Sequence, residues 1–132
     1  MTTPDELEQQ HTLSTATTRY DELRMRDALA AMTGDEDTET LSRSESLELL
    51  ALSEVVVRKA GYGRQAMVRT ARGAGASWTQ IGAALGTSKQ SAWETHNRWI
   101  EDQARQHELT GHQGFDPGEA DSARGLAGPN PR

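Results

Sequence analysis

The sequence of 132 residues contains no cysteine, which excludes disulfide bonds and thiolate metal sites. Its aromatic residues are few (Trp 3, Tyr 2, Phe 1) and provide little material for an aromatic-lined substrate pocket. The longest apolar runs, 49–52 and 55–57, are far shorter than the roughly 20 residues of a membrane-spanning helix. The N-terminal residues lack the basic and apolar blocks of a signal peptide. These absences predict a cytoplasmic protein with no membrane contact.

The formal net charge of −6 is distributed unevenly along the chain. Residues 1–57 contain four basic and thirteen acidic side chains, whereas residues 58–105 contain eight basic and three acidic ones. Residues 106–132 contain two basic and four acidic side chains. Such asymmetry is typical of a nucleic-acid-binding module that carries an acidic arm. We therefore look for a functional site in the basic block.

Apolar residues three and four positions apart predict a helix over residues 14–33, which Gly34 can cap. Residues 35–40 contain no apolar side chain and predict a solvated acidic loop. A second helix is expected to begin near residue 42 or 44 and to run to about residue 73. A break at residues 61–63 is the alternative, because each glycine there costs a helix about 1 kcal/mol. The apolar stripe of this helix fits an intramolecular core or the coiled coil of a dimer.

Two helix starts are predicted ten residues apart in residues 77–100. Ser77 is followed three residues later by Gln80, and Thr87 by Gln90, which is the spacing of a capping box. Gly86 stands where the turn after a helix needs a positive φ. The spacing leaves room for a two-turn helix, a tight turn and a second helix, which is the arrangement of a helix-turn-helix.

Residues 77–100 resemble the small DNA-binding helix-turn-helix proteins common in actinobacteria. The residues that match are Ser77, Trp78, Ile81, Gly82, Ala84, Leu85, Gly86, Ser88, Gln90, Ala92 and Trp93. The chain departs from that pattern at Thr87 and Ala92, where larger aliphatic side chains are usual. The resemblance implies a bacterial protein at the nucleoid, with a recognition helix at about 88–102 in the major groove of double-stranded DNA. If the chain forms a homodimer, the family geometry implies that its two recognition helices lie about 34 Å apart.

The helical period of 100° per residue assigns the faces of the second helix. Its core face is predicted to contain Ala92, His96, Trp99 and Ile100. The opposite face carries the expected base-reading side chains, Gln90, Ser91, Glu94, Asn97 and Arg98. Phosphate contacts are expected from Ser77, Thr79, Ser88, Lys89, Arg69 and Arg72. The same polar residues also fit the ordinary solvated face of a surface helix, and the arginines fit ordinary surface charges.

Signals of catalysis are missing from the sequence. His107 and His112 are five residues apart, with a helix-breaking glycine before the second, whereas a zincin needs histidines four residues apart on one face. No glycine-rich phosphate loop and no cluster of catalytic side chains stands out. We therefore expect a protein that is not an enzyme and that binds no metal and no cofactor.

The sequence predicts an all-α fold, a helical bundle with a C-terminal helix-turn-helix. Its expected parts are a flexible N-terminus (1–12), an acidic helical region for support or dimerisation (13–60), the DNA-binding domain (61–108) and a disordered tail (109–132). The function expected first is a sequence-specific DNA-binding protein that regulates transcription. The alternatives are an adaptor or antitoxin-like protein with an acidic partner-binding arm and a nucleoid-associated protein. The partners expected are double-stranded DNA, a second copy of the chain, and a protein bound by the acidic N-terminal region.

Overall fold

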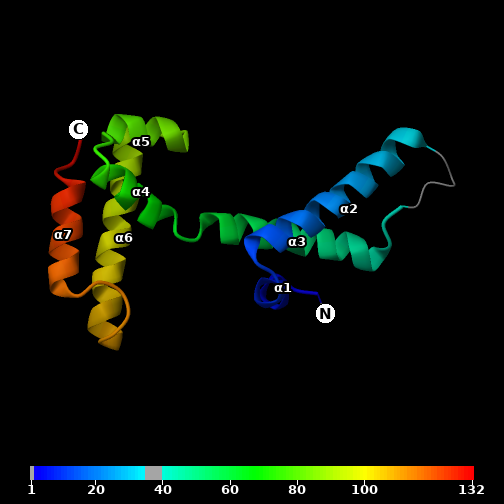
Figure 1. Ribbon diagram of the computed structural model, residues 1–132, viewed down its shortest axis with the longest axis horizontal. Coiled ribbons are helices and arrows are strands. Elements are labelled where there is room, and N and C mark those ends of the chain that lie inside the picture. Colours follow the sequence, from blue (N-terminus) through cyan, green and yellow to red (C-terminus); the bar gives the residue numbers. More distant parts are fainter. Residues whose placement is uncertain (1, 35–39) are drawn as a thin grey trace. The chain divides into compact units, whose positions relative to one another are not determined.

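The computed structural model describes residues 2–34 and 40–132, and every regular element in these ranges is an α-helix (Figure 1). The helices are α1 (Pro4–Gln10), α2 (Leu13–Thr33), α3 (Arg43–Gly61), α4 (Arg64–Gly73), α5 (Trp78–Leu85), α6 (Lys89–Thr110) and α7 (Pro117–Ala127). The chain divides into two compact units, Met1–Tyr62 and Gly63–Arg132, which are described separately. The expectation of an all-α fold is confirmed for the described residues. None of their helices is both long enough and apolar enough to cross a membrane.

The first unit begins with a short helix where the sequence predicts a flexible N-terminus. Thr3 caps α1 by accepting a hydrogen bond from the amide of Glu6, and Pro4 occupies the first helical position. Leu7 is buried, and Arg58 of α3 donates to Asp5 over 2.9 Å. The expectation of flexibility for residues 1–12 is therefore wrong. One buried leucine and an ion pair from a distant helix order a segment whose own composition is polar.

Local signals place the ends of α2 and α3. Helix α2 begins after a cap at Thr12 and ends at Gly34, whose φ is +58°, close to the predicted limits. Helix α3 begins after a capping box at Ser42 and ends before Tyr62. Gly63 has a φ of +75°, so the helical path stops there and α4 begins anew. The break is thus the correct alternative, and an uninterrupted helix to residue 73 is wrong. The acidic loop expected at 35–40 lies, except for its last residue, outside the described residues.

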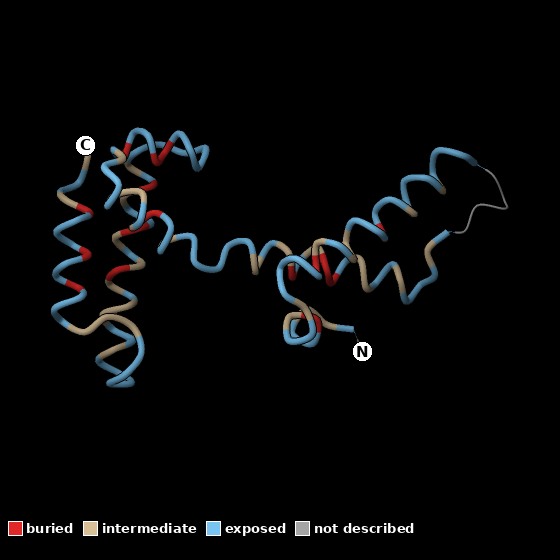
Figure 2. Tube along the Cα trace, in the orientation of Figure 1, coloured by how far each residue is buried: buried red, intermediate tan, exposed pale blue. Residues whose placement is uncertain are grey.

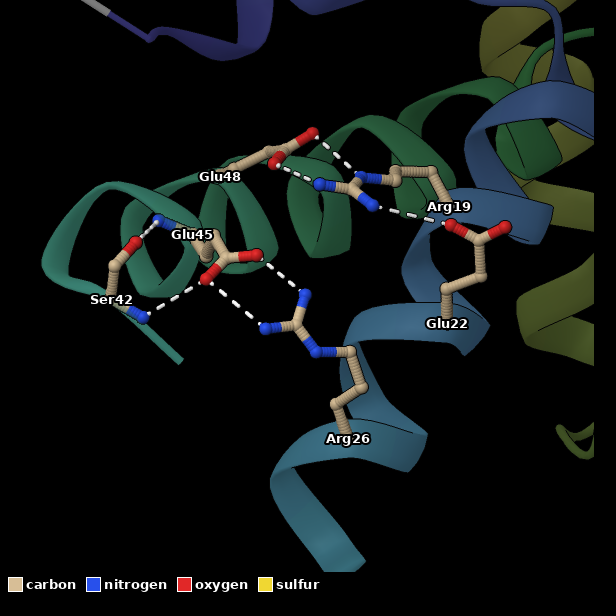
Figure 3. A network of polar contacts seen from close by, with 6 residues as sticks. All are labelled: Arg19, Glu22, Arg26, Ser42, Glu45 and Glu48. Carbon is tan, nitrogen blue, oxygen red and sulfur yellow. Dashed lines mark hydrogen bonds and ion pairs between the residues drawn. The ribbon is translucent and has the colours of Figure 1, made fainter. Parts of the chain in front are cut away.

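The first unit is held together by a small core and by ion pairs between α2 and α3. Its buried apolar residues are Leu7, Ala16, Leu23, Ala51, Leu52 and Val55 (Figure 2). Arg19 donates to both carboxylate oxygens of Glu48 over 3.0 Å each, and Arg26 donates to Glu45 over 2.5 and 3.3 Å (Figure 3). The bonds from Arg26 and from the backbone of Ser42 lower the pKa of Glu45 to about 2.

The second unit packs α4–α7 around a core of mostly small and aromatic side chains. Its buried apolar residues are Val68, Trp78, Ile81, Ala92, Ile100, Ala120, Ala123 and Ala127. Helices α6 and α7 lie side by side, and α5 packs against α6 (Figure 1). Helix α6 ends at Thr110 and is therefore longer than the expected recognition helix at 88–102.

The C-terminal segment forms a packed helix, so the expected disordered tail at 109–132 is wrong. Asp116 caps α7, and Pro117 occupies its first position. The buried side chains of α7 are Ala120, Ala123 and Ala127, spaced three and four residues apart. An alanine face lets α7 approach α6 closely without large apolar side chains. Pro117 and Gly128 mark the two ends of this helix. The high content of proline and glycine in this segment led to the prediction of disorder.

Candidate nucleic-acid interface

A short turn joins α5 to α6. Ser77 and Gln80 form the predicted capping box, with backbone-to-side-chain bonds of 3.1 and 2.9 Å. Gly86 ends α5 with a φ of +72°, as its place in the sequence predicts. The cap of α6 differs from the prediction, because Ser88 and not Thr87 accepts the bond, from the amide of Ser91 over 3.0 Å. Three residues, 86–88, therefore separate the end of α5 from the start of α6.

Gly82 allows the backbones of α5 and α6 to touch. A Cβ atom at this position would lie 2.8 Å from the carbonyl oxygen of Thr87, 2.9 Å from the carbonyl carbon of Ser88 and 3.0 Å from the amide nitrogen of Lys89. All three are backbone atoms, which cannot rotate away. The amide of Thr87 also donates to the carbonyl of Gly82 over 2.8 Å. The direction in which α6 leaves the turn is therefore fixed by a glycine in the middle of α5.

The core face of α6 agrees with the prediction, since Ala92, His96 and Ile100 are buried and Trp99 is half-buried. The ring of His96 lies between Trp78 and Trp99, with centroids 5.6 and 5.3 Å away. Its Nδ1 atom lies 2.9 Å from Oε1 of Gln65. Burial, together with the smaller effect of the charges of Arg69 and Arg72, lowers the pKa of His96 to about 4. The imidazole is therefore neutral at pH 7 and serves packing.

The outer face of α6 presents several of the predicted base-reading side chains to solvent. Ser91, Glu94 and Arg98 are exposed, as is Lys89 at the start of the helix. Thr95 is exposed as well, and the sequence analysis missed it although it lies on the line joining Ser91 to Arg98. No ion pair connects Lys89 or Arg98 with any residue in the described ranges. Two cations thus remain available on this face.

Two other predicted base-reading residues are less accessible. Gln90 is half-buried, and its Nε2 atom donates to Oε1 of Glu94 over 2.7 Å. Asn97 is half-buried and lies four residues from both Trp93 and Glu101. Those two residues bond the C-terminal segment: the indole of Trp93 donates to the carbonyl of residue 128 over 3.0 Å, and Glu101 accepts from an arginine of α7 over 2.8 Å. Helix α7 therefore occupies the side of α6 on which Asn97 lies.

The predicted phosphate contacts also divide into two groups. Ser77 and Ser88 cap their helices and Thr79 is exposed, so all three lie at helix N-termini. Arg69 is half-buried, with its guanidinium 5.1 Å from the ring centre of Phe115.

Arg72 has a structural role in place of the predicted phosphate contact. Its guanidinium donates to the carbonyls of Ala76, Leu126 and Ala127 over 3.0 to 3.4 Å and lies 5.1 Å from the ring centre of Trp78. All three of its nitrogens are thereby engaged. Two of the acceptors belong to the segment that the sequence predicts to be disordered, so no local signal could have revealed this role.

No family model, no curated protein and no solved structure matches this chain.

Proposed function

We propose that residues 77–100 form a helix-turn-helix that binds double-stranded DNA, and that the protein is a sequence-specific regulator of transcription. The observation that supports this most directly is the backbone contact at Gly82, which orients α6 rigidly against α5. Beyond the turn, the first three turns of α6 expose polar side chains and two cations that no ion pair engages within the described part of the chain. A rigidly held helix with a polar, partly cationic outer face fits the major groove.

Some of the exposed residues would contact base edges and others would contact phosphates. Arg98 can donate two hydrogen bonds to guanine, Glu94 can accept from the amino group of cytosine, and the methyl group of Thr95 can contact thymine. Ser91, on the same face, can bond to either kind of base edge. Lys89 at the start of α6, together with Ser77, Thr79 and Ser88 at the helix N-termini, would contact phosphates. Gln90 would reach a base only after it releases Glu94, and Asn97 and Arg72 leave the proposed set.

Fluorescence anisotropy with labelled duplexes tests this assignment. The alanine variants of Lys89 and Arg98 are compared with Arg43→Ala, which removes the same charge from an exposed position in the first unit. We expect Lys89→Ala to weaken binding to all sequences and to lower the salt slope by about one. Arg98→Ala should weaken binding to a selected site by about 10-fold or more and relax its preference at one base pair. Arg43→Ala should bind as the wild type does.

Other outcomes favour the alternative functions. Binding with no preference among duplexes would indicate a nucleoid-associated protein. Equal losses in all three variants would contradict a specific surface on α6. Absence of binding by the folded wild-type protein at low salt would contradict the proposal and favour an adaptor whose acidic region binds a protein.

A further inference from the structure

The end of the first unit that contains the C-terminal part of α2 and the N-terminal part of α3 has no buried side chain among its described residues. No residue in 24–33 or 41–50 is buried. Five large apolar side chains in these segments are at least half exposed: Met25, Leu29, Met32, Leu47 and Leu50. Among the described residues of the first unit, four large apolar side chains are buried, those of Leu7, Leu23, Leu52 and Val55. This unit therefore exposes more large apolar side chains at one end than it buries, which is typical of a surface that a partner covers.

Leu50 borders a hollow between α2 and α3 that Met25, Leu29, Met32 and Leu47 do not line. The hollow has a volume of about 420 Å³ and is lined by the small residues Ala28 and Ala31 of α2 and by Leu49 and Leu50 of α3. Leu50 is 66% exposed and also lines a neighbouring hollow of about 760 Å³ beside Leu47. When two copies of the chain meet, the projecting Leu50 of one copy can fill the 420 Å³ hollow of the other. The shape is therefore suited to contact with its own copy.

The charges at the hollow are also self-complementary. Arg24 and Asp27 both line it, and no ion pair engages either of them within the described residues. The guanidinium of Arg24 contacts Tyr20, whose hydroxyl accepts a hydrogen bond from Nη1 over 3.3 Å and whose ring centre lies 5.8 Å from the guanidinium carbon. In a two-fold contact the same patch faces itself, so the arginine of each copy can meet the aspartate of the other. Each copy then contributes one arginine and one aspartate, and both side chains form an ion pair across the contact.

We propose that this surface binds a second copy of the chain, with the two α2–α3 hairpins face to face and Leu50 of each copy in the 420 Å³ hollow of the other. The dimer arises within the first unit. It does not depend on DNA binding by the second unit, so either proposal can fail without the other.

Sedimentation velocity of the full chain tests the dimer. The wild type should sediment as a dimer at micromolar concentration. Leu50→Glu places a charge in the centre of the contact and should raise the dissociation constant by about 100-fold or more, since the change enters twice per dimer. Leu109→Glu is the matched control, because Leu109 is 86% exposed in the second unit and should leave the dimer unchanged. Circular dichroism of both variants should retain the wild-type helix content.

An exchange of the two charges tests the arrangement itself. Arg24→Glu and Asp27→Arg should each weaken the dimer, because each places like charges against one another. The double variant should restore the wild-type dissociation constant to within a few-fold, since it re-forms both pairs in reverse. A wild-type protein that stays monomeric up to about 100 µM would overturn the proposal. So would a dimer that tolerates Leu50→Glu, or a double variant weaker than both single ones.

Discussion

Replacing Gly82 with alanine tests the contact that orients α6. In the middle of a helix such a change ordinarily stabilises by about 1 kcal/mol, because alanine is the better helix former. Here the added Cβ would lie 2.8 to 3.0 Å from three backbone atoms of the turn and of α6. Overpacking of this kind costs typically 1–3 kcal/mol, and the upper end applies because backbone atoms cannot yield. We expect a net loss of about 2 kcal/mol.

The matched control is Gly125→Ala in α7. Gly125 is also inside a helix of the second unit, but apart from its chain neighbours and the backbone of its own helix no atom lies within 4 Å of the position that its Cβ would take. The ordinary gain of about 0.5–1 kcal/mol should therefore appear in full. Glycine-to-alanine replacement is thus expected to lower the free energy of unfolding at position 82 and to raise it at position 125.

Tryptophan fluorescence during thermal unfolding is the assay, because all three tryptophans belong to the second unit. For a unit of about 70 residues, 1 kcal/mol shifts the midpoint by about 4–8 °C. Gly82→Ala should lower the midpoint by about 10 °C, and Gly125→Ala should raise it by several degrees. A Gly82→Ala variant as stable as the wild type would refute the close approach of α5 and α6.

Three further predictions concern the second unit and use the same fluorescence readout. The pKa of His96 is about 4 in the folded state and 6.5 when unperturbed. The unfolded chain therefore takes up the proton first, and the unit should lose about 3 kcal/mol as the pH falls from about 6.5 to 4; His96→Leu should lack this dependence. Arg72→Ala should cost about 2 kcal/mol, since three carbonyls lose their donor, whereas Arg64→Ala at an exposed position should change stability by less than about 0.5 kcal/mol. Removal of residues 117–132 leaves two indole N–H groups without their acceptors and opens the core. Cooperative unfolding should therefore disappear. A sharp transition in the truncated chain would contradict a structural role for α7.

The parts of the fold that the sequence predicted are those encoded by neighbouring residues. The ends of α2, the capping box at Ser77 and the turn at Gly86 all depend on side chains within four positions. The buried face of α6 followed from the helical period alone. The cap of α6 was misplaced by one residue, because Thr87 and Ser88 are both good caps and only the packing of Gly82 on the turn distinguishes them.

The parts that the sequence analysis missed depend on contacts between distant segments. Helix α7 is ordered by its alanine face against α6 and by carbonyls that accept bonds from residues about 50 positions earlier. Its position in turn removes Asn97 from the exposed face and engages Arg72. Composition predicts disorder for such a segment, because alanine and glycine appear to offer little apolar area. Close packing of small side chains provides the stability that composition alone does not reveal.

The salt dependence of duplex binding by the wild-type chain tests the central claim most directly. With about two phosphates neutralised per chain, one by Lys89 and about one more by the N-terminal ends of α5 and α6 together, the association constant should fall about 12-fold between 50 and 200 mM salt. Anisotropy of a labelled duplex measures this, with tryptophan fluorescence as the control for folding. A linear logarithmic decline of that size is the result we expect. Absence of binding at 50 mM, or binding that does not change with salt, would contradict the assignment of this protein to duplex DNA.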